Sequence, residues 1–244
     1  MIDRVLVEAV IAAHVDAVWD AIRDPAKIAA WFGWDEPGQE DEIDFIFRRF
    51  GRADEAARIL RFEGTYDRFE LAERGPATRL RVIRLTPKGV HWGDLYEDMA
   101  EGWIGFIGQL RLAIERHDLA PRRTVHLSGD IRRGSMRPSV ALGLAAASET
   151  LPGDPVSLML ATGDRIEGQS WHRTPFQFGV TVDDFGDGLL VVTDKPPTDA
   201  APRGRGMVTL TTYGLDDARF AALEARWKNW WSLHYEKPAE IVGS

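Results

Sequence analysis

The sequence contains no cysteine. This absence excludes disulfide bonds, thiolate zinc sites, iron–sulfur clusters and a cysteine nucleophile. None of the six histidines has the spacing of a metal site, so we expect neither a bound metal nor a cofactor. The sequence also lacks a phosphate-binding loop, a complete dinucleotide-binding glycine pattern and a Gly-x-Ser-x-Gly nucleophile elbow.

Long apolar segments and an excess of basic residues are missing as well. No apolar run approaches the roughly 20 residues that a membrane-spanning helix needs. The N-terminus is already charged and strand-like at Asp3 and Arg4, so we expect no signal peptide and a cytoplasmic location. The formal net charge of −8 argues against binding to nucleic acid, because phosphate-backbone contacts need Lys and Arg gathered on one face. Arginine outnumbers lysine 25 to 5, and we expect these arginines to pair with surface carboxylates.

The 244 residues nevertheless provide enough material for a packed core. Hydrophobic residues make up 44% of the chain and aromatic residues 10%, which excludes a largely disordered protein. Nine tryptophans are a high number for this length. Each can bury ~150–250 Å² and carries an N–H that needs a partner.

The first half begins with a strand and two short helices. Residues 4–11 are rich in β-branched side chains and predict a strand. Val15, Val18, Trp19 and Ile22 then recur at helical spacing. Asp24-Pro25 ends this helix, and Pro25 can open a second one through Trp31.

Four strands and a long helix are expected next, the strands at roughly 43–50, 57–63, 65–73 and 77–86. The long helix should begin near Asp94, because Asp94 and Glu97 have capping-box spacing. Its apolar stripe consists of Met99, Trp103, Phe106, Ile107, Leu110 and Ile114.

Ala120-Pro121 interrupts the pattern, which predicts two domains, 1–120 and 121–244. After a strand at 123–131 and an Ala- and Leu-rich helix at 137–151, the closing helix is capped by Asp216 and carries Phe220, Leu223, Trp227, Trp230 and Trp231. The strands between them are expected at 156–162, 165–171, 175–183, 188–194 and 206–213, with a hairpin turn at 184–188.

The two long helices share an aromatic pair at three-residue spacing, Trp103 with Phe106 and Trp227 with Trp230. A glycine precedes each helix, Gly93 and Gly214. These shared features indicate an internal duplication with a period of about 120 residues.

Two motifs resemble a known family. Val18-Trp19-Asp20-Ala21-Ile22-x-Asp24-Pro25, followed by Ile28-x-x-Trp31-Phe32, resembles the opening of the START-like, or SRPBCC, superfamily. Glu101-Gly102-Trp103-Ile104 before Leu110-x-x-x-Ile114-Glu115 resembles the closing helix of its branch named after the activator of the heat-shock-protein-90 ATPase. The resemblance covers residues 4–118 through these motifs and 123–236 through element order and the closing helix. Val140-Ala141-Leu142-Gly143-Leu144 stands where the second half would repeat the opening motif.

The resemblance implies an α+β, helix-grip fold in two tandem copies, in which a curved antiparallel sheet surrounds a long C-terminal helix and leaves a cavity. Many members bind apolar small molecules there, some are polyketide cyclases or aromatases, and the eponymous proteins act on a chaperone. We therefore expect an apolar or amphipathic small-molecule ligand. The alternatives are a protein-interaction module, such as a chaperone activator, and a cyclase- or aromatase-like enzyme.

Physically, one helix cannot cover a whole curved sheet, so side chains, a ligand or a partner must fill the rest. Phe176 and Trp231 are among the large side chains available for this. The residues that we expect to contact a ligand are Trp31, Phe45, Phe47, Phe62, Trp92, Trp103, Phe106, Ile107, Leu110, Trp171, Phe178, Trp227 and Trp230. The aromatic stripes among them fit either a plain core or a cavity wall.

Adjacent tryptophans at 230 and 231 point about 100° apart on a helix. Both can be buried only if this helix is covered on two sides, by another domain or by a second copy of the chain; otherwise Trp231 is exposed. His91, His172 and His234 are either polar anchors of a cavity or structural histidines. We interpret the acidic run from Glu36 to Asp44 as a solvated loop.

Overall fold

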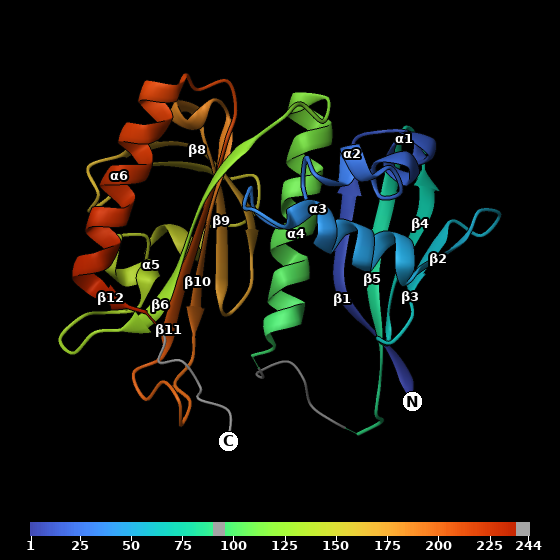
Figure 1. The fold of residues 1–244 in the computed structure, drawn as a ribbon, viewed down its shortest axis with the longest axis horizontal. Helices are drawn as coiled ribbons and strands as arrows, with labels where there is room; N and C mark the ends of the chain where they lie inside the picture. Colours follow the sequence, from blue (N-terminus) through green and yellow to red (C-terminus); the bar gives the residue numbers. More distant parts are fainter. Residues whose placement is uncertain (90–95, 238–244) are drawn as a thin grey trace. The chain divides into compact units, whose positions relative to one another are not determined.

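Two antiparallel β-sheets, one in each half of the chain, dominate the fold (Figure 1). The computed structural model describes residues 1–89 and 96–237. It divides the chain into two compact units, Met1–Pro121 and Arg122–Ser244. Sheets with added helices in both units confirm the predicted α+β class.

The sheet of the first unit has five strands in the order β1-β5-β4-β3-β2. The bounds are β1 Ile2–Ile11, β2 Gly51–Asp54, β3 Ile59–Phe62, β4 Asp67–Arg74 and β5 Ala77–Thr86. Because side chains alternate along a strand, the paired residues Val7, Val82 and Phe69 share one face, with Leu80 and Leu71 beside them. This inner face joins the hydrophobic core.

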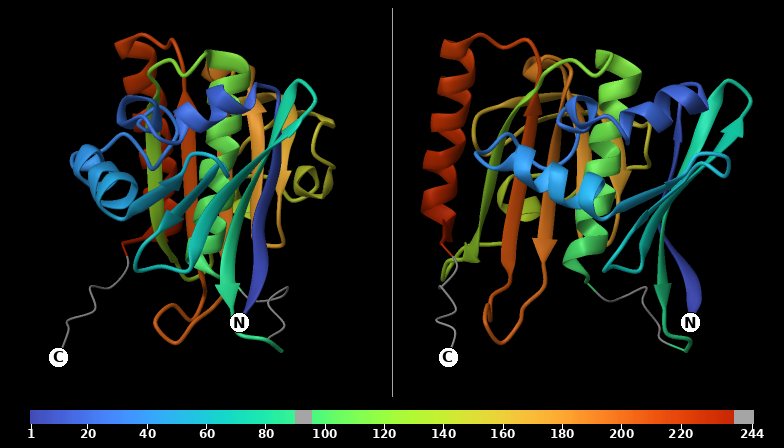
Figure 2. Two further views of the ribbon diagram at one scale, coloured as in Figure 1. Left: turned by 90° about the vertical axis from the view of Figure 1, so that its right-hand side faces the viewer. Right: turned by 45° about the vertical axis from the view of Figure 1, so that its right-hand side comes forward.

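The helices of the first unit are α1 Val15–Ala21, α2 Pro25–Ile28, α3 Gln39–Ile43, the π-helix η1 Asp44–Arg49 and α4 Asp98–His117. Asp24 caps α2 by accepting from the Ala26 N–H at 2.9 Å, and Pro25 is its first residue. Figure 2 (left) shows the strands of this sheet crossing in front of α4. Glu97, not Asp94, is the N-cap of α4, so the predicted start is too early; Gly93 and Asp94 lie outside the described residues.

The strand predicted at 43–50 is wrong, since these residues are helical and the strand β2 follows them. Ile43 and Phe47 are buried at helical spacing, whereas Phe45, which alternation would place on the same face, is 52% exposed. The Phe50 N–H bonds to the Phe45 carbonyl, as in a π-helix. A Cβ on Gly51 would lie 2.1 Å from the Phe47 carbonyl oxygen, so only glycine lets the chain turn here into β2.

The sheet of the second unit has the order β12-β6-β11-β10-β9-β8-β7. Its bounds are β6 Arg123–Ile131, β7 Pro155–Met159, β8 Arg165–Arg173, β9 Gln177–Val182, β10 Gly188–Lys195, β11 Arg205–Thr212 and β12 Tyr235–Glu236. The short strand β12 was not predicted. The helix α6 spans Asp217–His234, and the Asp216 side chain accepts from the Arg219 N–H at 2.8 Å, which confirms the predicted cap.

The helix predicted at 137–151 is mostly wrong. Only α5 Pro138–Ala141 and the 3-10 turn η2 Ala147–Glu149 form. Gly143 has a φ of +86°, in the left-handed region that ends a helix. The predicted hairpin turn between β9 and β10 does form, as η3 Asp183–Phe185 followed by Gly186.

On the inner face of this sheet, cross-strand rows pack against α6. One row is Phe178, Val192, Val208 and Leu127, and all four belong to or contact the cluster that contains Trp227. Two residues farther along these strands, the next row that faces inward consists of Asp194, Gly206 and Gly129. A Cβ on Gly206 would lie 2.3 Å from Pro138 Cγ and 3.1 Å from the Trp231 ring. The glycines therefore make room for Pro138 and Trp231.

Both Trp230 and Trp231 are buried, which excludes the alternative of an exposed Trp231. Trp231 stacks on Tyr235 with ring centroids 3.9 Å apart, and Trp230 stacks on His234 at 4.4 Å. Residues of the same unit thus bury both tryptophans, where we expected a second domain or a second copy of the chain to do so.

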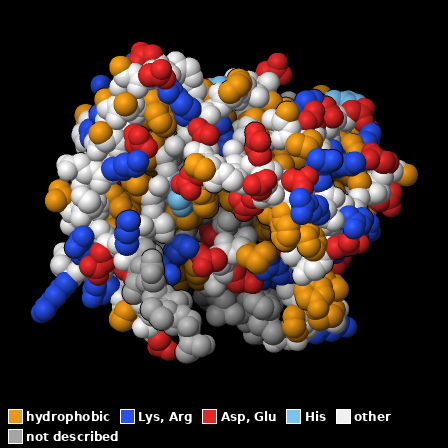
Figure 3. Space-filling model, viewed as in Figure 1, with side chains coloured by type: hydrophobic (Ala, Val, Ile, Leu, Met, Phe, Trp, Pro, Cys, Tyr) orange, Lys and Arg blue, Asp and Glu red, His pale blue; other side chains and the backbone are white. Residues whose placement is uncertain are grey.

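Basic and acidic side chains are interspersed over the face of the molecule shown in Figure 3. In the first unit Arg48 and Arg49 both pair with Asp44, at 3.0 and 2.7 Å, and Arg52 pairs with Glu63 at 2.7 Å. These exposed pairs match the expected role of the arginines.

Candidate functional site

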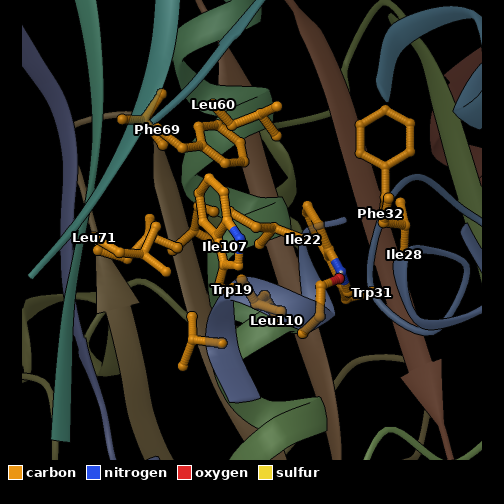
Figure 4. Packing of buried hydrophobic residues seen from close by; sticks show 14 of the residues in the cluster. Trp19, Ile22, Ile28, Trp31, Phe32, Leu60, Phe69, Leu71, Ile107 and Leu110 are labelled. Atoms are coloured by element: carbon orange, nitrogen blue, oxygen red, sulfur yellow. Dashed lines mark hydrogen bonds between the residues drawn. The ribbon is translucent and has the colours of Figure 1, made fainter. Parts of the chain in front are cut away.

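Most of the aromatic residues predicted as a site in the first unit belong to one hydrophobic cluster with α4. Figure 4 shows part of this cluster, with Trp31, Ile107 and Leu110 among the labelled residues. Trp103 stacks on Phe62 at a centroid distance of 5.7 Å and meets the edge of Phe69 at 4.9 Å. Phe32 contacts Phe47 at 5.0 Å and Phe106 at 4.9 Å. The cluster also contains Trp31, Ile107 and Leu110, each of which is at most 1% exposed to solvent. The rings contact one another, which is the packing of a core.

Among the described residues, one predicted residue does not join this cluster. Phe45 is exposed and contacts Phe50, with ring centroids 4.5 Å apart. Trp92 lies outside the described residues, as does His91. Conversely, Phe32 and Phe69 are central to the cluster but are not among the predicted site residues. Phe32 belongs to the Ile28-x-x-Trp31-Phe32 motif, and Phe69 lies at an alternating buried position of β4.

A chain of charged groups borders the aromatic cluster. Asp67, whose side chain is 1% exposed, accepts from Arg84 Nε at 2.6 Å and Nη2 at 2.8 Å, and from Trp103 Nε1 at 3.1 Å. Arg84 also donates to Glu97 at 3.3 Å, and Glu97 pairs with Arg4. The hydrogen bonds that Arg84 donates to Asp67 raise the pKa of the Arg84 guanidinium. These groups satisfy each other, so they connect α4 to the sheet rather than provide a free acid or base.

The second unit contains two adjoining hollows near the end of β10. The smaller, here the Phe178 hollow, has a volume of about 280 Å³ and reaches the inner face of the sheet at Phe178 and Val192. Its polar wall includes Ser139, Arg173 and Asp194. Among the predicted site residues Phe178 is therefore the one that lines it.

The larger, here the Pro196 hollow, has a volume of about 620 Å³. Its apolar wall comes from β6, α5 and the chain after β10, with Ile131, Val140, Pro196 and Pro197. Both hollows share Arg137, Pro175, Phe176 and Asp194. The shared residues make them two compartments of one site, which we call the Asp194 groove.

Asp194 is held mainly by Ser139. The Ser139 N–H donates to Asp194 Oδ1 at 3.0 Å, and the Ser139 hydroxyl donates to Oδ2. Arg137 Nε lies farther away, 3.5 Å from Oδ2. The Asp194 side chain is 17% exposed and that of Arg137 62%. The Asp194 carboxylate is thus held by Ser139 on its buried side, while the Arg137 guanidinium lies at the solvent-exposed opening of the groove.

The other predicted residues of the second unit are core or structural. Trp227 is fully buried in the hydrophobic cluster, and its indole N–H has no acceptor among residues 1–89 and 96–237. Trp230 belongs to the same cluster. Trp171 is buried at a bulge of β8 and does not line either hollow.

Two of the three histidines that the sequence suggested as cavity anchors, His172 and His234, are described and have structural partners. His172 Nε2 lies 2.8 Å from Gln177 Oε1, and His234 Nδ1 lies 2.8 Å from the Trp230 carbonyl. No three Asp, Glu or His side chains of the described ranges gather where they would hold a metal ion.

Sequence reasoning missed the polar part of the Asp194 groove. Arg137, Ser139 and Asp194 come from segments more than 50 residues apart in the chain, and no local motif links them. Phe178, which is among the predicted site residues, and Phe176, a large side chain of the second half, are the sequence signals for the groove wall.

No protein-family model matches the chain, and no curated protein matches it. Among solved structures, DynU16 from the dynemicin biosynthetic locus is 20% identical, with a TM-score of 0.32, over 93% of this chain and 94% of that chain. The di-domain ARO/CYC StfQ from the steffimycin pathway is 12% identical over 96% of both chains, with a TM-score of 0.33. The di-domain ARO/CYC BexL from the BE-7585A pathway is 13% identical over 96% of this chain and 94% of that chain, with a TM-score of 0.32.

None of these three is described as an activator of the heat-shock-protein-90 ATPase. Such low identities and TM-scores leave the activity of this chain to be inferred from its own residues. Within the described part of the chain, no helix combines the length and apolarity needed to cross a membrane.

Proposed function

We propose that this protein binds an apolar or amphipathic small molecule, and that the Asp194 groove of the second unit is the binding site. The observation that carries the proposal is the pair of adjoining hollows that share the apolar wall Pro175–Phe176. Volumes of about 280 and 620 Å³ lie in or near the range of small-molecule sites, ~300–1,000 Å³. The Pro196 hollow combines an apolar wall with a few polar groups, which is the usual composition of such sites.

We also propose that both units are START-like domains of the helix-grip type. In the first unit the order of β1, α1, α2, antiparallel strands and α4 supports this. In the second, the inner rows of the sheet pack against α6 in the same manner, although the opening pair of short helices is replaced by α5 and η2. A ligand among Trp31, Phe47, Phe62, Trp103 and Phe106 of the first unit stays a prediction, as do the alternatives of an interaction module and an enzyme.

The proposal is tested with N-phenyl-1-naphthylamine, a neutral probe whose fluorescence rises in apolar sites. Binding is measured for the wild-type chain and for Phe176→Ala, which removes the shared wall, and Val140→Trp, which fills the Pro196 hollow. Phe45→Ala is the matched control, because Phe45 is an exposed phenylalanine outside the groove.

We expect both groove variants to weaken probe binding at least about tenfold, by loss of buried contact area or of space, while Phe45→Ala binds like the wild type. Unchanged binding in both groove variants, or no probe binding to the wild type, would contradict the proposal. Circular dichroism spectra of each variant exclude a loss of fold as the cause.

A further inference from the structure

The charges around the Pro196 hollow are unbalanced. Three cationic side chains line it, Arg137, Lys195 and Arg203. Among the described residues, Asp194 is the one carboxylate of the lining, and Glu236 outside the lining pairs with Arg203. This occurs in a chain whose formal net charge is −8. A local excess of positive charge beside an apolar wall favours an anionic ligand group.

The carboxylate of Asp194 does not depend on Arg137. Both of its oxygens already accept hydrogen bonds from Ser139, one from the N–H and one from the hydroxyl. Arg137 Nε at 3.5 Å is beyond the 2.7–2.9 Å of a typical charge-assisted hydrogen bond. Arg137 can therefore turn to another acceptor without leaving Asp194 unsatisfied.

Arg203 has a different role, because it is already held in place. Its Nε donates to the Ile131 carbonyl at 2.5 Å and its Nη2 to Glu236 at 3.0 Å. Its charge is offset by Glu236 and its geometry is fixed. Arg137, exposed at the mouth, is thus the residue best placed to receive an incoming anion.

From this arrangement we infer that the natural ligand of the Asp194 groove carries one carboxylate, which pairs with the Arg137 guanidinium while its apolar body lies against Val140, Phe176 and Pro196. The inference rests on the proposed function. A planar guanidinium matches a carboxylate with two parallel hydrogen bonds. The neighbouring charge of Asp194 disfavours a dianionic group such as a phosphate monoester.

The test compares three probes with the same ring system: naphthalene-2-carboxylate, the neutral naphthalene-2-carboxamide and 2-naphthyl phosphate. Their affinities are measured by titration calorimetry or ligand-observed NMR for the wild type and for Arg137→Gln. Arg48→Gln is the matched control, since Arg48 is similarly exposed (66%) and pairs with one aspartate of the first unit.

For the wild type we expect the carboxylate to bind at least about tenfold more tightly than the carboxamide, and more tightly than the phosphate. Arg137→Gln should abolish the preference for the carboxylate and leave carboxamide affinity within about twofold. Arg48→Gln should change neither value.

Equal affinities for carboxylate and carboxamide in the wild type would overturn the inference but leave the proposed function intact. A preference that survives Arg137→Gln, or tighter binding of the phosphate, would also overturn it. If no probe binds, the proposed function fails and the inference fails with it.

Discussion

The indole N–H of Trp103 donates to the buried carboxylate of Asp67 at 3.1 Å. The partner that this tryptophan N–H needs thus comes from β4, on the sheet opposite the helix. Because the same carboxylate accepts two hydrogen bonds from Arg84, one acidic side chain fixes a strand pair and the helix α4 together.

Asp67→Asn should destabilise the first unit strongly. The substitution keeps the shape but removes the negative charge, so Arg84 loses its main partner while it stays largely buried. Breaking a buried pair from one side costs about 3–5 kcal/mol. Urea unfolding followed by tryptophan fluorescence measures the loss. Asp44→Asn, which breaks exposed pairs, should cost less than about 1 kcal/mol, and equal losses for both variants would show that the Asp67 network has no special role.

Trp31→Phe and Trp227→Phe form a second comparison, because both side chains are fully buried. Trp31 Nε1 donates to the Ala21 carbonyl at 3.0 Å, whereas the Trp227 N–H has no acceptor among the residues that the structure describes. The Trp31 variant leaves a carbonyl unpaired and should cost about 1–2 kcal/mol more in the free energy of unfolding. Urea unfolding midpoints followed by circular dichroism check this. A larger loss for Trp227→Phe would mean that its N–H has a partner, such as bound water or ligand.

Glu55 should make the stability of the first unit depend on acid pH. The hydrogen bond from Arg23 and that from Trp19 Nε1 at 2.6 Å lower the pKa of the Glu55 carboxyl. A folded-state pKa below the unfolded one contributes stability that is present above the unfolded value of about 4.5 and is lost as pH falls through the folded value. Glu55→Gln should therefore flatten the fall of the urea midpoint between about pH 5 and pH 3.

The control for that measurement is Glu40→Gln, since Glu40 is exposed and has no ion pair among the described residues. It should keep the wild-type pH profile. If Glu55→Gln keeps that profile too, the contact of Glu55 with Trp19 and Arg23 does not persist in solution.

The local sequence predicted the secondary structure correctly where it depends only on interactions between residues close together in the chain. Residues 123–131 were predicted as a strand and form β6, and Asp216 caps α6 as expected, because alternation and capping depend only on nearby residues. The same local reasoning failed at 43–50 and 137–151. At 43–50 the chain forms the π-helix η1, which ends where Gly51 packs against the Phe47 carbonyl, instead of the strand that alternation predicted. At 137–151 the left-handed conformation of Gly143 ends the predicted helix early.

Only the tertiary structure decided where the candidate site lies. The aromatic stripe of α4 fits either a core or a cavity wall by sequence, and in the structure its rings contact other aromatic rings of the cluster. The Asp194 groove arises from side chains of α5, β9 and β10 that the register brings together. Likewise Trp231 is buried because Gly206 and Gly129 lie opposite each other on paired strands. Such relationships depend on strand pairing between distant segments, and residue types along the chain do not encode that pairing locally.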